Sequence, residues 1–411
     1  MRTKIEEQRP GNDSGADESA DPGRRGFIKT AVVAAAGASA AGLLKPSPAE
    51  AASGPMKKRY GDGPYAAEGM ALYSSEGPHK VMKFQRRALG PKDVAIQLHY
   101  CGVCHSDIHH GREHWRKETF PLITGHELAG VVVAVGSSVS KFKPGSRVGV
   151  GCMVNSCRHC GPCEAGMEQY CENGNVFTYA SKDRDGSMTQ GGYSTFNVVD
   201  EDFVIDVPDV IGLADAGPMM CAGITVYSPL RRWSVGPGRK VGVVGLGGLG
   251  HMAVKIAAAM GAEVTVLTTS SAKVEDARRF GAKTVIVNEP GADLSKFKRS
   301  LDFILDTAPY RHDLERIIPL LKLDATLCMV GAGKIVEPHQ IGPFSLLRNR
   351  NSFASSQIGG IRETQELVGF CALHGIRPTI TKISREKIDD AWTKVVDKAA
   401  RYRFVIDMAA A

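Results

Sequence analysis

The chain reads Gly245-Leu246-Gly247-Gly248-Leu249-Gly250 directly after the apolar run 240–244 and at the start of an Ala-rich segment with helical spacing. Between a strand and a helix, a Gly-x-Gly-x-x-Gly pattern indicates a binding site for the pyrophosphate of a dinucleotide. Gly245 allows the tight turn, Gly247 lets the backbone approach the phosphates, and Gly250 lets the helix pack closely on the strand. The predicted cofactor-binding residues of this loop are Gly245, Gly247, Gly248, Leu249 and Gly250.

The segments around this loop alternate between strand-like and helix-like patterns. Apolar runs with the length of buried strands lie at 240–244, 263–267, 284–287, 303–305 and 326–330. Repeated strand–helix–strand units predict a parallel sheet with helices on both faces. We therefore expect residues 222–360 to form a doubly wound α/β domain that binds a nucleotide.

The tip of the second strand indicates which dinucleotide binds. NAD-binding domains usually carry Asp or Glu there, about 20 residues after the glycine motif, to accept the ribose hydroxyls. This chain has Thr268-Thr269-Ser270-Ser271-Ala272-Lys273 instead, and hydroxyls with one ammonium suit a 2′-phosphate. We predict NADP(H), bound through Thr269, Ser270 and Lys273. The alternative interpretation is an ordinary helix N-cap followed by a surface lysine.

The preceding residues, 52–221, have a different pattern of apolar and turn-forming residues. Short β-like runs, separated by Gly and Pro turns, lie at 94–98, 130–135, 147–150 and 197–199. They predict a mostly β domain, in the form of a partly closed barrel. The last segment, 361–411, has a helical pattern at 362–374 and a strand pattern at 403–406, and we expect it to return to the β domain.

One set of metal-ligand residues is local. It reads Cys157-x-x-Cys160-x-x-Cys163 and is followed after seven residues by Cys171, within a lobe at 152–175. Four thiolates saturate a tetrahedral zinc ion, so this set predicts a structural zinc site.

The second set of metal-ligand residues is dispersed. It comprises Cys104 in Gly-Val-Cys-His-Ser-Asp, His126 in Gly-His-Glu and Cys221 in Cys-Ala-Gly. Three ligands leave one position of a tetrahedral zinc ion open for a substrate oxygen. A cation there lowers the pKa of a hydroxyl, which prepares an alcohol to give up a hydride. With the dinucleotide domain, this set predicts a zinc-dependent dehydrogenase that transfers hydride between NADP(H) and a primary alcohol or aldehyde.

The residues around these ligands resemble the zinc alcohol dehydrogenase signature of the medium-chain dehydrogenase/reductase superfamily. The matching residues are Gly125-His126-Glu127-x2-Gly130-x5-Gly136-x2-Val139. Segments 102–107, 190–194 and 221–227 resemble its cinnamyl alcohol dehydrogenase-like branch. The resemblance extends over essentially the whole chain after residue 51. It implies a GroES-like catalytic domain, a Rossmann domain, two zinc ions per chain, an aromatic or medium-sized aldehyde as substrate, and a homodimer.

The resemblance also implies roles for residues beside the ligands. Glu127 lies next to the metal and can take its fourth position, and Asp107 orients the metal-bound histidine. Ser106 and His109 pass the alcohol proton through the cofactor ribose toward solvent. Each has an alternative interpretation: Ser106 as a helix cap, Asp107 as a charge at a helix N-terminus, and His109 as a solvated surface imidazole.

Several residues stay outside these assignments. Trp115 is either a wall of the substrate pocket or a packing aromatic. Ser146 replaces the Asp of the family's Pro-Gly-Asp turn, and Gln357 stands where an aromatic is common, which leaves the substrate open. The sequence does not support a disulfide between Cys328 and Cys371.

Two other functions agree with parts of the pattern. A quinone or enoyl reductase would share the fold but lack the three-ligand set. An exported protein that binds zinc and a dinucleotide without catalysis is the second alternative, because NADP(H) is not expected outside the cytoplasm.

The chain's composition is that of a globular protein, with 43% hydrophobic and 23% charged residues and a net charge of +7. It contains no basic run dense enough to indicate a nucleic-acid partner.

The first 51 residues have the layout of a signal. Arg24-Arg25 precedes an Ala-rich apolar stretch at 30–44, and Ala49-Glu50-Ala51 follows. This arrangement predicts a twin-arginine signal peptide cleaved after Ala51, recognition by the twin-arginine export machinery, and a periplasmic or exported protein. The apolar stretch is too short for a stable membrane span, which needs about 20 residues.

Overall fold

The computed structural model describes residues 61–408, so the predicted signal peptide at 1–51 lies outside the described residues. Six strands form a sheet in the order β12, β11, β10, β13, β14, β15, and every neighbouring pair is parallel. Their bounds are β10 (Lys240–Val244), β11 (Glu263–Thr268), β12 (Thr284–Val287), β13 (Leu301–Asp306), β14 (Leu321–Met329) and β15 (Ser352–Ser355). The strand order reverses between β10 and β13, which is where doubly wound sheets bind ligands.

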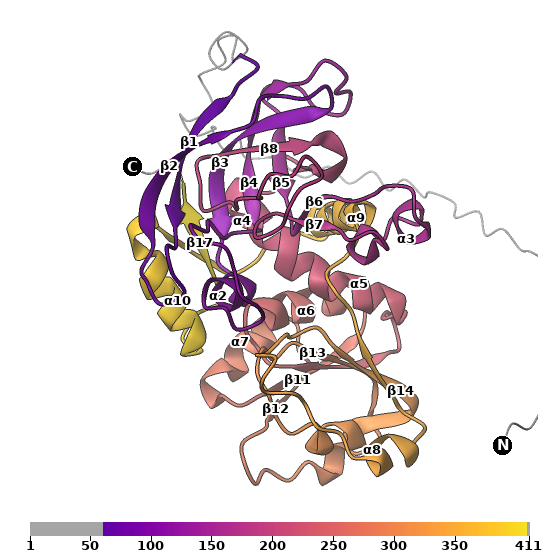
Figure 1. The fold of residues 1–411 in the computed structure, drawn as a ribbon. Coiled ribbons are helices and arrows are strands. Elements are labelled where there is room, and N and C mark those ends of the chain that lie inside the picture. Colours follow the sequence, from indigo (N-terminus) through magenta and orange to yellow (C-terminus); the bar gives the residue numbers. More distant parts are fainter. Residues whose placement is uncertain (1–60, 409–411) are drawn as a thin grey trace, which may run out of the picture. The chain divides into compact units, whose positions relative to one another are not determined.

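Both faces of this sheet are buried. Val241 and Val243 of β10 share one buried cluster with residues of α5 (Ile224–Arg232) and α6 (Gly248–Ala259). Leu267 and Ile304 belong to a second cluster, against which α8 (Pro343–Leu347) packs through Leu346. Figure 1 shows α5 and α6 above the strands and α8 below them. Burial on both faces explains the continuous apolar runs, and the prediction of a doubly wound parallel sheet is confirmed.

The β-rich half is built on a seven-stranded sheet with the path β16, β17, β3, β4, β5, β9, on which β8 pairs with β3. The strands from the first half of the chain are β3 (Asp93–Gly102), β4 (Leu128–Val135), β5 (Arg147–Val150), β8 (Phe196–Asp200) and β9 (Ile205–Asp206). Two separate two-stranded sheets are β1 (Tyr65–Ala71) with β2 (Lys80–Arg86), and β6 (Met153–Asn155) with β7 (Val176–Phe177). The predicted GroES-like, mostly β domain is confirmed.

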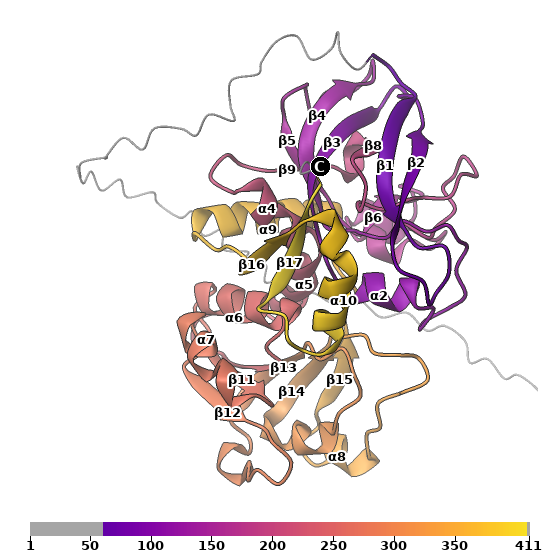
Figure 2. The same ribbon diagram turned by 90° about the vertical axis from the view of Figure 1, so that its left-hand side faces the viewer.

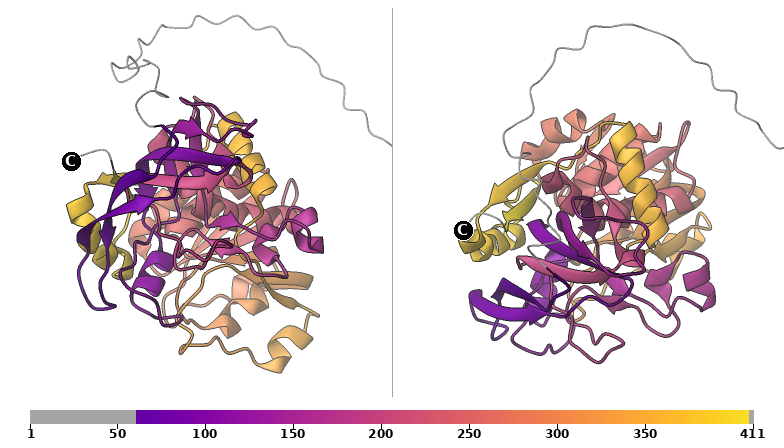
Figure 3. Two further views of the ribbon diagram at one scale, coloured as in Figure 1. Left: turned by 45° about the horizontal axis from the view of Figure 1, so that its top comes forward. Right: turned by 90° about the horizontal axis from the view of Figure 1, so that it is seen from above.

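The C-terminal segment adds its last strands to this β sheet. Strand β17 (Arg403–Asp407) runs antiparallel to β3, with Val405 opposite Gly102. Figures 2 and 3 show the yellow C-terminal strands and helix beside the indigo and purple strands of the first half. Helix α9 (Ile361–Leu373) packs instead against α5.

Two C-terminal elements were missing from the sequence interpretation. Strand β16 (Ile380–Ile383) is a four-residue edge strand with two exposed residues, so its apolar pattern is weak. Helix α10 (Ile388–Val396) buries only Ile388, Ala391, Trp392 and Val395, and its function as a cover for the β core is visible only in the fold.

The first of the two connections between the halves is a continuous helical path. Helix α4 (Leu213–Pro218) continues into the π-helical turn η4 (Met219–Gly223) and then into α5. Such π-helical turns inside helices are frequent at functional sites. Among the described residues, no helix combines the length and the apolar character that crossing a bilayer requires.

Candidate active site

A cavity of about 1470 Å³ brings together residues from both halves of the chain. Predicted metal-side residues on its wall are Cys104, Ser106, His126 and Cys221. Predicted cofactor-side residues on its wall are Gly245, Gly247, Gly248, Leu249, Thr269, Ser270 and Lys273. The other residues predicted for the catalytic metal, the proton relay and the cofactor, Asp107, His109, Glu127 and Gly250, are buried.

Three separate elements contribute the dispersed ligand set. Cys104 is the N-cap of α2 (His105–Gly111), His126 precedes β4, and Cys221 lies in the π-helical turn. His126 Nε2 lies 3.2 Å from Cys221 Sγ, which is 3.9 Å from Cys104 Sγ. With Glu127, the ligand atoms all lie within 4.8 Å of one another, and all four residues are buried. Two thiolates and an imidazole are donors that zinc prefers.

Asp107 is the fully buried carboxylate that holds this set in place. Its Oδ1 accepts the Gly125 N–H at 3.0 Å and lies 2.9 Å from His126 Nδ1, so His126 Nε2 is left for the metal. Its Oδ2 accepts the Cys104 N–H at 2.9 Å and the Tyr193 hydroxyl at 3.1 Å. Asp107 also lies in the first turn of α2 and completes a capping box there. The side chain is therefore both the partner of His126 and the charge at the helix N-terminus of the alternative interpretation.

Glu127 connects the ligand set to the far end of the chain. Its Oε1 accepts a hydrogen bond of 2.6 Å from Arg403, and both side chains are buried. Burial raises the pKa of Glu127 to about 7, although the charge of Arg403 opposes this shift. Its Oε2 is buried and has no hydrogen-bond partner among the described residues. A free carboxylate oxygen beside two thiols and an imidazole fits a cation at this place.

The glycine loop has the geometry of a phosphate cradle. Gly245 has φ of +85°, and a Cβ on Gly250 would lie 2.1 Å from the Gly245 carbonyl oxygen. Gly247 is the N-cap of α6, and a Cβ there would meet no atom within 4 Å. The space in front of the helix N-terminus therefore fits a pyrophosphate, which the helix dipole attracts. Arg403 lies beside this loop, 2.6 Å from the place of a Cβ on Gly248.

The strand tip after β11 forms a second polar corner of the cavity. Lys273 Nζ donates to the Leu246 carbonyl at 3.0 Å and lies over the ring of Tyr402. Burial, followed by the charge of Arg401, lowers the pKa of Lys273. Because Lys273 is held between these groups, it is not the freely solvated surface lysine of the alternative interpretation.

Ser106 and His109 lie on α2, one on the cavity wall and one behind it. Ser106 Oγ is 3.8 Å from Cys104 Sγ, and because Cys104 is the N-cap, the interpretation of Ser106 as the cap is wrong. His109 is 5% exposed, so the interpretation as a solvated surface imidazole is also wrong. Trp115 stacks on His109 with ring centroids 4.8 Å apart, and its Nε1 donates to the Gly333 carbonyl at 2.8 Å. Trp115 therefore both lines the cavity and packs.

The local cysteine set is also assembled. The sulfur atoms of Cys157, Cys160, Cys163 and Cys171 lie within 4.8 Å of one another. Backbone N–H groups point at two of them: Cys157 N–H donates to Cys171 Sγ and Glu172 N–H to Cys160 Sγ, both at 3.4 Å. Such donors stabilise thiolates, which are the form that binds zinc.

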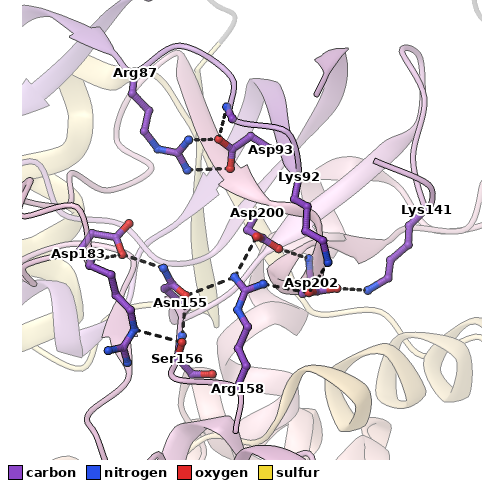
Figure 4. Close-up of polar contacts among 12 residues, drawn as sticks. Arg87, Lys92, Asp93, Lys141, Asn155, Ser156, Arg158, Asp183, Asp200 and Asp202 are labelled. Carbon is purple, nitrogen blue, oxygen red and sulfur yellow. Dashed lines mark hydrogen bonds and ion pairs between the residues drawn. The ribbon is translucent and has the colours of Figure 1, made fainter. Parts of the chain in front are cut away.

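Figure 4 shows how the cysteine lobe is tied to the β sheet. Arg158, between the first two cysteines, has φ of +69° and bridges Asp200 at 2.9 Å and Asp202 at 3.1 Å. Lys141 contacts the same Asp202 at 2.5 Å. A network of charges therefore ties Arg158 of the lobe to the end of β8, and Met153 and Val154 pack the base of the lobe into the apolar core of the β half.

The remaining residues singled out from the sequence have modest roles. Ser146 closes its turn by accepting the Lys143 N–H at 3.1 Å. Gln357 lines the cavity. Cys328 and Cys371 are free, fully buried thiols.

Sequence reasoning missed Arg403, Tyr193 and His114, which contact predicted site residues. Arg403 and Tyr193 are far along the chain from the residues they contact, so no local spacing indicates them. His114 has only the histidine-rich composition of 105–114 as a signal.

The fold and this cavity define a two-domain dehydrogenase with a metal site. Residues 90–209 match the alcohol dehydrogenase GroES-like domain family, and residues 248–373 match the zinc-binding dehydrogenase family. The chain belongs to the zinc-dependent medium-chain alcohol dehydrogenase family, as its resemblance predicts.

The chain aligns with individual relatives over nearly the whole of their lengths. NADP-dependent alcohol dehydrogenase C 1 of Mycolicibacterium smegmatis is 49% identical over 340 residues, 82% of this chain and 97% of that protein. Aldehyde reductase YahK of Escherichia coli is 46% identical over 82% of this chain and 97% of its own length. The structure of CAD from Helicobacter pylori complexed with NADP(H) is 42% identical, with a TM-score of 0.80 over 84% of this chain and 99% of that one.

Replacing Asp107 by Asn tests its role in the ligand set. An amide keeps one acceptor oxygen but turns N–H groups toward buried donors, so His126 loses its orientation. We expect zinc affinity at this site to fall about 10- to 100-fold. Zinc measured by atomic emission after dialysis against a chelator should fall from two ions per chain to one, because the four-cysteine site is untouched. Asp209→Asn, at a side chain that is 94% exposed, is the control. Retention of both ions by Asp107→Asn would contradict the assignment.

Proposed function

We propose that this protein is a zinc-dependent, NADP(H)-linked alcohol dehydrogenase that interconverts primary alcohols and aldehydes. The observation that carries the proposal is one cavity that holds Cys104, His126 and Cys221 at one end and the glycine loop at the other. In a reductase of the same fold without zinc, there would be no reason for these three ligands to converge. The names of the relatives agree with NADP(H) and with alcohol or aldehyde substrates.

When bound, zinc supplies a Lewis acid and the dinucleotide supplies a hydride donor or acceptor. The protein's own residues orient these groups and move the proton. Cys104, His126 and Cys221 hold the metal, and Glu127 is placed to take a fourth position beside them. Cys157, Cys160, Cys163 and Cys171 hold the structural zinc.

The proton-handling and cofactor-orienting residues lie next to these ligands. Ser106 lies beside Cys104 on the cavity wall and orients the hydroxyl that reacts. His109, buried on the same helix α2, is the proposed acceptor of its proton, which would reach it through the cofactor ribose. Gly245, Gly247, Gly248, Leu249 and Gly250 form the pyrophosphate cradle. Thr269, Ser270 and Lys273 are the proposed contacts of the 2′-phosphate.

The cavity wall favours an apolar or aromatic substrate. Its lining includes Trp115, Phe177, Tyr179, Phe353 and Ile358. Tyr179 lies against the ligand His126, with ring centroids 5.7 Å apart. Aromatic walls of this kind bind rings and alkyl chains well. We therefore propose aromatic and medium-sized aldehydes as the substrate class. A homodimer stays a prediction from the family resemblance.

The function is tested by assaying aldehyde reduction over a panel of aromatic and aliphatic aldehydes with NADPH. We expect turnover by the purified protein and its loss in Cys104→Ser, because a hydroxyl is a poor zinc ligand. Cys371→Ala, at a buried thiol of α9, controls for the general effect of removing a sulfur atom. A zinc-loaded protein without activity on the whole panel would refute the enzymatic proposal.

The choice of dinucleotide is tested with Lys273→Ala. A charged hydrogen bond to phosphate contributes about 1.5–3 kcal/mol, so we expect KM for NADPH to rise about 10- to 100-fold. The KM for NADH should change little, because NADH has no 2′-phosphate. Lys296→Ala, at an exposed lysine of the same domain, is the control. Equal increases for both dinucleotides would indicate that Lys273 contacts a part they share.

We also propose that residues 1–51 direct export of the folded protein through the twin-arginine pathway. The support is the Arg24-Arg25 pair, the apolar stretch and the Ala49-Glu50-Ala51 site. Export after folding would let the six proposed zinc-binding thiols bind metal before they reach an oxidising compartment.

Replacing Arg24 and Arg25 together by Lys tests the export. In a host with this pathway, we expect the original chain in the periplasmic fraction, beginning at Ala52 by N-terminal sequencing. The double variant should stay in the cytoplasm at full length. The same location for both proteins would refute the export proposal.

A further inference from the structure

Two histidine rings meet behind the cavity in a way that the functions above do not use. His109 Nδ1 lies 3.0 Å from Nδ1 of His114, which is a hydrogen bond between two ring nitrogens. One nitrogen must carry a proton and the other must accept it, because two protonated or two bare nitrogens repel each other. The pair therefore always shares one proton between the two rings.

His109 has no other described route to solvent. It is 5% exposed, and its Nε2 is buried without a hydrogen-bond partner among the described residues. Trp115 stacks on the ring at an interplanar angle of 22°, which prevents the imidazole from swinging outward. A proton that enters at Nε2 can leave the ring only through Nδ1, and the bond at Nδ1 goes to His114.

His114 lies at the end of this path. It follows α2 in a loop closed by its own N–H, which donates to the His109 carbonyl at 2.8 Å and brings the two rings together. The residue is half-buried, so its ring is accessible to water, unlike that of His109. The neighbouring His110 does not compete for the role, because its Nδ1 lies 2.5 Å from Glu118 Oε1.

We propose that His114 is the outer relay residue through which the proton of the reaction passes between His109 and water. This inference rests on the proposed alcohol dehydrogenase function. In alcohol oxidation, His109 Nε2 gains a proton and the proton on His109 Nδ1 moves to His114 Nδ1. His114 then releases its Nε2 proton to water. One proton enters and one leaves, only N–H bonds change, and no electrons are transferred. Each ring is left in its other tautomer, and proton exchange with water restores the first tautomers before the next oxidation. Aldehyde reduction uses the same steps in reverse.

The charges around His109 and His114 favour passing a proton on over holding it. Burial, followed by the neighbouring His105 and His114, lowers the pKa of His109 to about 4, with His110 in the same direction and Cys104 opposing. Burial, Lys334 and Arg112 lower the pKa of His114, and Glu337 opposes them. Both rings are therefore neutral at pH 7 and hold the extra proton only in transit.

His114→Ala tests the relay by kinetics. We expect kcat for alcohol oxidation at pH 7 to fall about tenfold or more, with little change in KM, since general acid–base steps contribute at least this much. Free imidazole in the buffer should restore the rate, and kcat should become dependent on buffer concentration. His374→Ala, at the C-cap of α9 and far along the chain from this pair, should behave like the original protein.

A double variant distinguishes the relay from a structural role. If the two rings act in series, His109→Gln with His114→Ala should be no slower than His109→Gln alone. Additive losses, or a loss that imidazole does not restore, would overturn the proposal. An unchanged kcat and buffer dependence in His114→Ala would overturn it as well.

A readout without turnover separates this inference from the proposed function. In protein labelled with ¹⁵N-histidine, NMR titration should show the pKa of His109 rising when His114 is replaced by Ala, because His114 lowers the pKa of His109 in the original protein. If the protein proves inactive on alcohols but this coupling is present, the proposed function fails while the proton-sharing pair stands. An unchanged pKa of His109 would overturn the coupling itself.

Discussion

The buried carboxylate of Asp107 is the interaction on which the rest of the site depends. It joins the N-terminus of α2, the turn before His126 and the hydroxyl of Tyr193, which in turn accepts the indole N–H of Trp392 at 3.3 Å. Each buried donor left without its acceptor would cost about 1–3 kcal/mol, so these segments hold one relative position. A single acidic side chain thereby sets the distance between Cys104 and His126 and links both to α10.

The second constraint is the return of the chain to the β sheet. Because β17 pairs with β3, Arg403 is placed between Glu127 and the glycine loop. A buried ion pair adds little net stability when it forms, but removing one partner costs about 3–5 kcal/mol. The ion pair between Glu127 and Arg403 thus acts mainly to fix these two side chains in one relative position. It couples the metal side of the cavity to the cofactor side through one guanidinium group.

Prediction from sequence succeeded where a residue type has a local physical reason. The runs at 240–244 and 263–267 fall on the neighbouring strands β10 and β11, since a strand buried on both faces must be almost continuously apolar. The four-cysteine lobe and the glycine loop are likewise local, and their spacing implies their geometry. Prediction failed for β16 and α10, whose short or one-sided apolar patterns acquire meaning only from the core that they cover. It also missed His114, because a hydrogen bond between two rings depends on the loop that closes α2.

The sequence by itself determined the class of chemistry: thiolates and an imidazole for zinc, glycines for a pyrophosphate, and hydroxyls with a lysine in place of an acidic strand tip. These follow from residue type and near spacing, which do not change when the chain folds. Tertiary structure alone decided which residues share the cavity and how they are connected. Arg403, Tyr193 and Trp392 reach the site from positions far along the chain, and only strand pairing and core packing bring their polar atoms within hydrogen-bond distance of it.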